Sequence, residues 1–256
     1  MMQVDLNSDM GEGYGDWRMG DDMALLEVVT SANVACGGHA GDWDVMAATM
    51  RAAAARGVGI GAHPGFADLQ GFGRRRIAMP PDSVAHLVAW QFGAARGVAA
   101  AVGAEVRHFK LHGALSNMSC EDEALARAAY EAALRVDPDI ILLVLAGTVQ
   151  ERVAKDLGAN WAGEIFADRG YNDDATLVTR GQPGAMIHDP EEAAARMVRF
   201  VSSGAIRSAS GRAIPAAIDS ICLHGDGPEA VAIARAVRAA LEAEGIELAP
   251  MVARRG

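Results

Sequence analysis

Polar and ionisable side chains gather at the ends of six of the seven apolar runs in this sequence. In chain order the clusters are Asp5, Asn7, Asp9 and Glu12; Asn33 and His39; His63; Lys110 and His112; Glu164, Asp168 and Arg169; and His224 with Asp226. The fifth run, residues 140–147, ends without such a group. Carboxylates, imidazoles and cationic side chains are the groups that carry general acid–base catalysis and stabilise developing negative charge. The pattern therefore indicates an enzyme-like site.

The apolar runs have the length and composition of β-strands, near residues 2–7, 31–36, 57–63, 105–112, 140–146, 161–167 and 219–224. Ala-rich stretches with helical spacing separate most of them, which is the βα alternation of an α/β barrel or a doubly wound sheet. In both folds the carboxyl ends of parallel strands open onto one face. We therefore expect one cavity to be lined by Asp9, His39, His63, Lys110, His112, Asp168 and His224.

Three of the strands carry a polar face, because side chains two positions apart in a strand point the same way. The groups that share a face are Asp5, Asn7 and Asp9; His108, Lys110 and His112; and Cys222, His224 and Asp226. Helices should cover the outside of the sheet, so a polar stripe must face something buried and needs partners there. The stripes predict either a buried polar network or a site.

Capping residues predict the limits of several helices. Asp189, Pro190 and Gly204 supply an N-cap, a first-turn proline and a left-handed stop, and residues 42–57 and 228–245 follow the same scheme. Residues 171–189 are too rich in turn-forming residues for a helix. They predict a short hairpin or lid above the strand ends.

Composition narrows the class of protein. The 256 residues are 51% hydrophobic and contain no linker-like segment, so we expect one domain spanning 1–256. A formal net charge of −10 argues against a nucleic-acid or anionic-membrane surface, although Arg74, Arg75 and Arg76 form a local basic group. The first residues lack the pattern of a signal peptide, so we expect a cytoplasmic protein. Three cysteines without a CxxC pair make a disulfide framework unexpected.

The sequence motifs bear on four kinds of chemistry: nucleotide binding, catalysis by a serine nucleophile, metal binding and general acid–base catalysis. The sequence has no Walker A motif and no GxSxG elbow, and residues 11–15 are a weak phosphate-loop signal that includes an acid. Without HExxH, a bound metal would have to be assembled from separate strands, for example by Asp9, His63 and His224. General acid–base catalysis, with Lys110 stabilising negative charge, fits the residues best.

Six ordered motifs carry a resemblance to a known family. They are DLNSDMGEGYG, ANVACGGHAGD, GAHPGFADLQGFGRR, FKLHGALSN, EIFADRGY and CLHGD, and together they resemble the LamB/YcsF family from the first strand to the last. Ser116 stands where we expect a tyrosine in that family. The resemblance implies an α/β fold, an irregular seven-stranded (β/α) TIM-like barrel of the glycoside hydrolase and deacetylase type. It also implies the ATP-dependent hydrolytic opening of the 5-oxoproline lactam to glutamate by a 5-oxoprolinase, in which this chain would work together with subunits B and C.

The implied reaction suggests roles for the residues. We expect Lys110 and His112 to stabilise developing charge, and Asp9 or His63 to act as a base. Asp168 and His224 complete the candidate catalytic set. Candidate binding residues for the lactam, or for ATP with a divalent metal such as Mg²⁺, are Asn7, Gly11, Glu12, Asn33, His39, Arg74, Arg75, Glu164, Arg169 and Asp226.

Three alternatives stay open at this point. One is a metal-dependent deacetylase or amidohydrolase that needs no ATP. Another is a non-catalytic subunit that binds the lactam. For Lys110 itself, the alternative to a catalytic role is a structural ion pair with Asp5 or Glu164.

Overall fold

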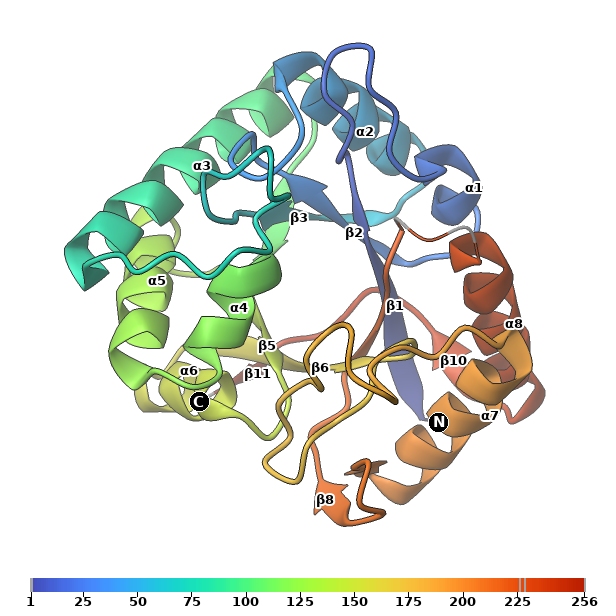
Figure 1. The fold of residues 1–256 in the computed structure, drawn as a ribbon. Helices are drawn as coiled ribbons and strands as arrows, with labels where there is room; N and C mark the ends of the chain where they lie inside the picture. Colours follow the sequence, from blue (N-terminus) through green and yellow to red (C-terminus); the bar gives the residue numbers. More distant parts are fainter. Residues whose placement is uncertain (1, 226, 228, 256) are drawn as a thin grey trace.

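The computed structural model describes residues 2–225, 227 and 229–255 and shows a closed barrel of seven parallel strands. Around the barrel the strands are β1 (Gln3–Met10), β2 (Ser31–Ala35), β3 (Gly59–His63), β4 (Val106–Phe109), β5 (Ile141–Leu145), β6 (Asn160–Phe166) and β9 (Ser220–Leu223). The last strand, β9, lies between β6 and β1 and closes the ring. The expected seven-stranded α/β barrel is confirmed (Figure 1).

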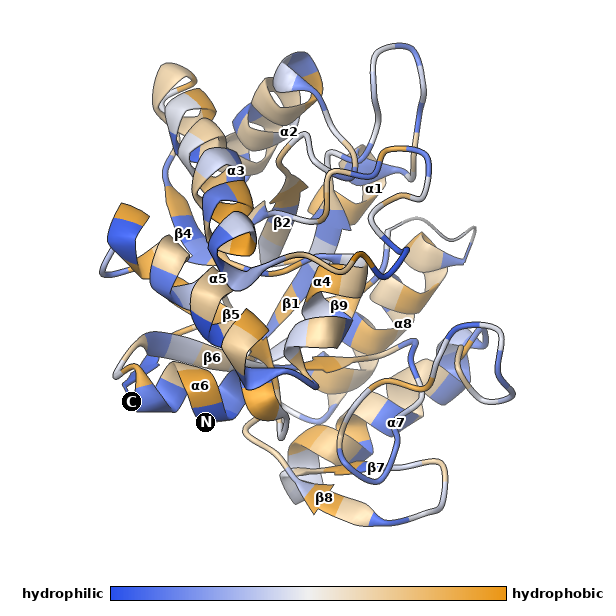
Figure 2. Cartoon of the chain, turned by 60° about the vertical axis from the view of Figure 1, so that its left-hand side comes forward, coloured by the Kyte–Doolittle hydropathy of each residue, from blue (hydrophilic) through white to orange (hydrophobic). Residues whose placement is uncertain are grey.

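Helices surround the barrel on its outside (Figure 1). The longer ones are α2 (Trp43–Ala55), α3 (Pro81–Ala101), α5 (Glu123–Val136), α6 (Val149–Asp156), α7 (Pro190–Ser203) and α8 (Ala230–Ala243); α1 (Asp22–Leu26) and α4 (Gly113–Ser119) are short. The outward side chains of the strands, such as Leu6 and Leu142, are fully buried and belong to one continuous apolar core. Hydrophilic and hydrophobic residues alternate along several of the helices that cover this core (Figure 2).

The predicted capping residues define the helix ends. Asp42 accepts hydrogen bonds from the backbone N–H groups of residues 44 and 45, and Asp189 accepts one from residue 191. Gly204 ends α7 with a φ of 62°, a left-handed conformation that a side chain would disfavour. The third predicted helix, 228–245, corresponds to α8, and its first residue, Pro228, lies outside the described residues.

The inside of the barrel is polar, as strand alternation predicted. Near the amino ends of the strands, Asp5 accepts hydrogen bonds from the hydroxyls of Thr30, Ser31 and Ser220. One layer higher, Asn33 donates to Oδ1 of Asn7 at 2.7 Å. The polar stripes are thus a connected network within the barrel.

The same layer also contains the imidazole ring of His108. His108 donates from Nε2 to Oδ1 of Asn33 at 2.7 Å, and Gly61 on β3 leaves the space that this imidazole fills. A β-carbon at Gly61 would overlap the ring. The glycine is therefore required by packing and not by backbone conformation.

Some elements differ from the expectation. The fourth strand ends at Phe109, although the N–H groups of Lys110 and His112 still donate to the carbonyls of Ala62 and Pro64 at 3.0 and 2.8 Å. These bonds keep both side chains in the positions that strand alternation predicted.

Four short strands were not predicted. A small antiparallel pair, β7 (Ala205–Arg207) and β8 (Ala213–Pro215), follows α7. At the amino end of the barrel, β10 (Glu247–Leu248) pairs with β1 and β11 (Arg254–Arg255) pairs with β6.

Residues 171–189 contain no helix and fold back on themselves, as expected, with bridges Arg169–Met186 and Tyr171–Leu177. Among the described residues, no helix is long and apolar enough to cross a membrane.

The tight packing at Gly61 generates a stability prediction. We expect Gly61→Ala to lower the free energy of unfolding by roughly 1–3 kcal/mol, because the new methyl group must displace the buried, hydrogen-bonded His108. Gly97 in α3 is the matched control, since it is exposed and its β-carbon would meet nothing within 4 Å. Gly97→Ala should be neutral or stabilising because alanine is the better helix former. Urea unfolding of the two variants measures the difference, and equal stabilities would contradict the packing argument.

The buried Asp5 generates a pH prediction. Burial raises the pKa of Asp5 to about 6, despite the lowering effect of the three hydroxyl donors. The folded state therefore binds this proton more tightly than the unfolded state, and the stability it contributes below about pH 4 is lost as pH rises through 6. A pKa of about 6 in place of 3.8 corresponds to about 3 kcal/mol.

Asp5→Asn removes this titration. The free energy of unfolding of wild type minus that of Asp5→Asn should fall by about 2 kcal/mol between about pH 4 and pH 7. Urea unfolding at a series of pH values gives this difference. A difference that stays constant over the range would exclude a raised pKa for Asp5.

Candidate active site

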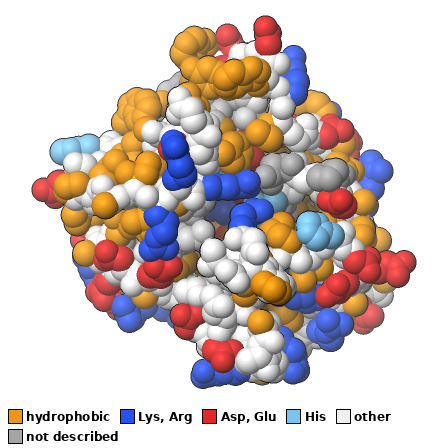
Figure 3. Space-filling view, viewed as in Figure 1, with side chains coloured by type: hydrophobic (Ala, Val, Ile, Leu, Met, Phe, Trp, Pro, Cys, Tyr) orange, Lys and Arg blue, Asp and Glu red, His pale blue; other side chains and the backbone are white. Residues whose placement is uncertain are grey.

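A cavity of about 310 Å³ opens at the carboxyl end of the barrel. Five of the seven side chains expected to line one cavity do so, namely Asp9, His63, Lys110, His112 and His224. They come from the ends of β1, β3, β4 and β9, so residues more than 200 positions apart meet here. Lys and Arg side chains gather around the hollow in this face of the molecule (Figure 3).

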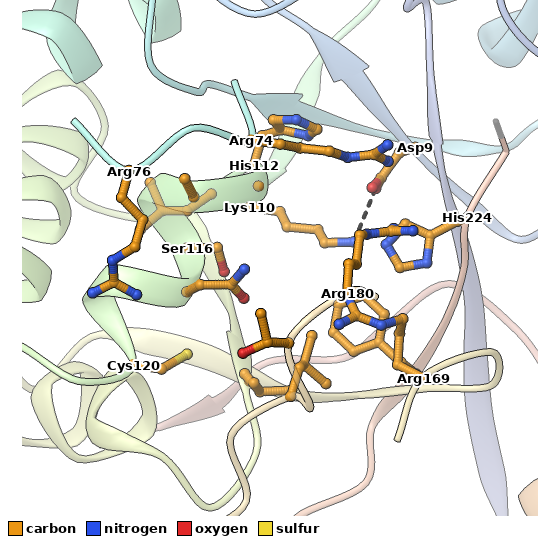
Figure 4. A pocket seen from close by; sticks show the side chains of 18 of the residues that line it. Asp9, Arg74, Arg76, Lys110, His112, Ser116, Cys120, Arg169, Arg180 and His224 are labelled. Atoms are coloured by element: carbon orange, nitrogen blue, oxygen red, sulfur yellow. Dashed lines mark hydrogen bonds and ion pairs between the residues drawn. The ribbon is translucent and has the colours of Figure 1, made fainter. Parts of the chain in front are cut away.

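Lys110 lies at the centre of the site, beside Asp9 (Figure 4). Glu164 is its second carboxylate partner. Its Nζ is 2.9 Å from Oδ1 of Asp9, 2.9 Å from Oε1 of Glu164 and 3.0 Å from Sγ of Cys222. Burial alone would lower the pKa of Lys110, but Asp9, Cys222 and Glu164 raise it well above its usual value. Burial would likewise raise the pKa of Asp9, yet its interactions with His63 and Lys110 hold it well below its usual range. The pair is therefore charged.

This arrangement decides between the two expected structural partners of Lys110. Glu164 forms the ion pair, whereas Asp5 bonds to hydroxyls one layer below. Cys222 is also buried, and its sulfur accepts a hydrogen bond from Lys110. Lys110 thus both belongs to a buried ion pair and lines the cavity.

Three histidines and a glutamate form a second cluster in the cavity wall. His63 Nε2 is 3.3 Å from Oδ2 of Asp9, and His39 Nε2 is 3.4 Å from Oε1 of Glu12. The ring of His39 stacks on that of His112, with centroids 3.5 Å apart. Burial lowers the pKa of both His39 and His112 well below the usual value. His39 and Glu12 lie behind the lining residues and not in the cavity surface.

His224 and Asp168 form an imidazole–carboxylate pair. Nδ1 of His224 lies 2.7 Å from Oδ2 of Asp168, and the ring stacks against Phe166 with centroids 5.2 Å apart. Burial would raise the pKa of Asp168, but its interactions with His224 and Arg169 bring it below the usual value. The ionised carboxylate fixes Nδ1 as the protonated nitrogen, which leaves Nε2 as the nitrogen able to accept a proton. Asp168 itself does not line the cavity, but it contacts His224, which does.

Four arginines surround the cavity: Arg74, Arg76, Arg169 and Arg180 (Figure 4). Arg169 donates to the carbonyls of Val178 and Ala185 at 2.7 and 3.1 Å, which anchors the folded-back segment 171–189. Burial and the nearby Arg180 lower the pKa of Arg169 to about 10, so it is protonated at neutral pH. Guanidinium groups at this density favour anionic ligands such as carboxylates and phosphates.

Other predicted site residues lie outside the cavity. Asn7, Asn33 and Glu164 belong to the polar layers beneath it. Arg75 points away and is bound to Asp68, with Nε 2.9 Å from Oδ2. Arg75 therefore does not line the cavity, whereas its neighbour Arg76 does. Asp226 lies outside the described residues.

The glycine-containing loop of residues 11–15 does not present its amide groups to the cavity. The N–H of Gly11 donates to Asp22 at 2.8 Å, and that of Gly15 donates to Asp42 at 2.6 Å. The N–H of Tyr14 donates to the carbonyl of Trp17. These three donors are occupied within the protein, which argues against a phosphate cradle formed by this loop.

Arg180 and Asn117 line the cavity, although neither was proposed as a functional residue from the sequence. A sequence signal for Arg180 existed, since it is the only lysine or arginine in the segment 171–189. Ser116, the position where a tyrosine was expected, also lines the cavity. Its hydroxyl accepts a hydrogen bond from Gln150 at 3.1 Å, so the smaller side chain still has a polar partner.

Comparison with solved structures supports this fold. A lactam utilization protein from Thermus thermophilus superimposes with a TM-score of 0.91 at 43% identity, covering 97% of this chain and 99% of that one. The catalytic domain of a peptidoglycan N-acetylglucosamine deacetylase from Eubacterium rectale superimposes with a TM-score of 0.52 at 12% identity, covering 97% and 88%. The second likeness concerns the fold alone and confirms a barrel of the deacetylase type.

Sequence comparison leads to the family. A protein of Ruegeria pomeroyi described as the A subunit of 5-oxoprolinase is 61% identical over 248 residues, which cover 97% of this chain and 98% of that protein. A Rhodopseudomonas palustris protein with the same description is 50% identical over 251 residues, covering 98% of both chains. The profile of the LamB/YcsF family matches residues 4–256. With the six motifs, five of which contribute residues to the cavity lining, this match shows that the chain belongs to the LamB/YcsF family.

Proposed function

We propose that this chain is the A subunit of an ATP-dependent 5-oxoprolinase, which opens the lactam of 5-oxoproline to L-glutamate together with subunits B and C. The observation that carries the proposal is the 61% identity, over nearly the full length, to a relative described as the A subunit of 5-oxoprolinase. The residues of the cavity supply the groups that this reaction needs. We also propose that the protein works in the cytoplasm.

The reaction requires activation of a stable amide. Transfer of a phosphoryl group from ATP to the lactam oxygen makes the ring carbon electrophilic and releases ADP. Water then adds to that carbon and loses a proton to a base. For the ring to open, the carbon–nitrogen bond must break and the nitrogen must take up a proton. The resulting acyl phosphate is hydrolysed to glutamate and phosphate.

His224 is the best placed base for the water. Asp168 accepts the Nδ1 proton, so Nε2 can take a proton from water and later return it to the ring nitrogen. Asp9 is less suited, because its interactions with His63 and Lys110 keep its pKa low. His63 donates from Nδ1 to the carbonyl of Lys110 and faces Asp9 with its other nitrogen.

Positive charge in the cavity fits an anionic substrate. Lys110 is placed to stabilise charge on the lactam oxygen, and Arg74, Arg169 and Arg180 can bind the substrate carboxylate and a phosphoryl group. The volume of about 310 Å³ is at the lower end of the range for small-molecule pockets, about 300–1,000 Å³. This size supports a phosphorylated lactam as the occupant. We propose that ATP with Mg²⁺ acts in the assembled enzyme, with the partner subunits completing its site.

Reconstitution tests the proposed function. The isolated chain should turn over 5-oxoproline and ATP at a negligible rate, and adding subunits B and C should give glutamate formation coupled to ADP release. The assay measures both products with and without the partners. ATP-coupled turnover by the isolated chain would contradict the need for partners, and hydrolysis without ATP would favour a simple amidohydrolase.

Lys110 offers a test that separates catalysis from stability. Lys110→Met should lower turnover of the reconstituted enzyme by roughly a hundredfold or more. It should also lower the free energy of unfolding by roughly 3–5 kcal/mol, because Glu164 and Asp9 lose their buried partner. The double variant Lys110→Met/Glu164→Gln removes one unpaired carboxylate, so it should recover much of the stability but not the turnover.

The control for Lys110 is Lys155, the only other lysine, which is exposed on α6. Lys155→Met should leave turnover unchanged. Urea unfolding and steady-state turnover are measured for each variant. Near-normal turnover by the stable double variant would exclude a catalytic role for Lys110.

A further inference from the structure

The histidine cluster in the cavity wall concentrates potential metal ligands. Glu12, His39, His63 and His112 each bring a potential ligand atom to one place, and these atoms all lie within 4.8 Å of one another. All four side chains are buried. A β-carbon at either Gly65 or Gly73 would collide with His39, so two glycines make room for the cluster. The proposed lactam chemistry assigns no role to Glu12 or His39.

Hydrogen bonds to the backbone decide where the protons of two imidazoles lie. Nδ1 of His63 is 2.9 Å from the carbonyl oxygen of Lys110, and Nε2 of His112 is 2.9 Å from the carbonyl oxygen of Phe72. A carbonyl oxygen can only accept a hydrogen bond. In the neutral rings, the proton therefore lies on the nitrogen that faces the carbonyl, which is the outer nitrogen of each ring. The inner nitrogens, Nε2 of His63 and Nδ1 of His112, are then bare acceptors, and they face each other at 3.0 Å.

Two lone pairs that face each other in a buried site repel unless a proton or a metal ion lies between them. Carboxylates add to the same acceptor cluster, since Glu12 Oε1 is 3.8 Å from the inner nitrogen of His112 and Asp9 Oδ2 is 3.3 Å from that of His63. Backbone carbonyls that hold the outer nitrogen of a histidine are a recurrent support of metal-binding imidazoles, because they fix the tautomer that leaves the other nitrogen bare.

The spacing of the acceptor atoms fits a small transition-metal ion. Zinc bonds to imidazole nitrogen and carboxylate oxygen are about 2.0–2.2 Å long, so tetrahedral ligand atoms lie about 3.3–3.6 Å apart. The separations here are 3.0 Å between His63 and His112, 3.4 Å between His39 and Glu12, and 3.8 Å between His112 and Glu12. Imidazole ligands select zinc and its neighbours over magnesium, which prefers oxygen.

We propose that Glu12, His63 and His112 bind one divalent transition-metal ion of the zinc type in the cavity wall, with His39 as the fourth ligand. The rings of His63 and His112 are nearly perpendicular, at 89°, so both can direct a nitrogen at one ion. His39 is stacked parallel to His112, at 4°, and must tilt away from it to join them. The proposal does not depend on the 5-oxoprolinase reaction.

Direct metal binding tests the proposal on the intact chain with no histidine tag. Protein grown with added zinc should carry one ion per chain by inductively coupled plasma mass spectrometry. After chelation, titration with Co²⁺ should give the visible absorption of a four-coordinate cobalt site, which Zn²⁺ removes and excess Mg²⁺ does not. His63→Gln and His112→Gln should each weaken Co²⁺ binding by at least roughly a hundredfold, the upper end of the loss seen when only a supporting residue is removed.

The control is His188→Gln, because His188 is exposed and remote from the cluster in sequence. It should bind cobalt like the wild type. Wild-type binding that is absent, or that is equally strong in His63→Gln and His112→Gln, would overturn the proposal.

A second measurement covers the case in which these variants do not fold. The melting temperature of the wild-type chain should rise with zinc concentration after chelation, because an ion that binds only the folded state stabilises it by mass action. A melting temperature that is unchanged by saturating zinc would also overturn the proposal. Both measurements are independent of lactam turnover, so failure of this proposal leaves the proposed function intact.

Discussion

The arrangement of polar side chains inside this barrel depends on the buried ammonium group of Lys110. A charge removed from water needs partners of opposite sign, and those partners must themselves be held by hydrogen bonds. Asp9 and Glu164 supply the opposite charge. Asn33 donates to Asp9 at 2.9 Å and Asn7 donates to Glu164 at 3.0 Å, so the two amides fix the carboxylates. The polar layers below the cavity therefore serve the charges at its floor.

Balanced ion pairs and excess positive charge lie at different depths along the barrel axis. At the floor, one lysine is matched by carboxylates, whereas arginines predominate around the mouth. The chain as a whole carries a formal charge of −10. A cationic mouth on an acidic molecule concentrates the attraction for anions at one place and leaves the remaining surface repulsive to them. This distribution suits a small anionic substrate better than a polyanion that contacts a wide surface.

Much of the fold and part of the site followed from local rules. The alternation of Asp5, Asn7 and Asp9 placed one side of β1 in the barrel interior, because the period of a strand is two wherever it lies. Capping residues likewise fixed helix ends through a local contact, since Asp189 accepts a hydrogen bond from a backbone N–H only two residues away. In both cases the physical cause lies within a few residues of its effect.

Residues in loops could not be placed in this way. Arg75 and Arg76 are adjacent, yet one binds Asp68 and the other lines the cavity, a choice made by the path of the loop in three dimensions. The amides of residues 11–15 looked available for phosphate until the structure showed Asp22 and Asp42 accepting from two of them. Strand alternation likewise gave no means of distinguishing His39, behind the cavity wall, from His112 in it.

The position of β9 between β1 and β6 has a consequence for the order of folding. The hydrogen bonds of Asn7 reach Glu164 and Ser220, which lie 157 and 213 residues further along the chain. During synthesis, β1 is among the first strands made, but its second neighbour in the barrel is among the last. Contacts between such distant segments carry a high loop-closure entropy and slow the folding of the chain. Until residues 220–223 are available, one edge of β1 has no strand beside it, and such an edge is a template for pairing with other chains. The geometry that brings the two ends of the sequence into one site therefore exposes the nascent chain to aggregation for most of its synthesis.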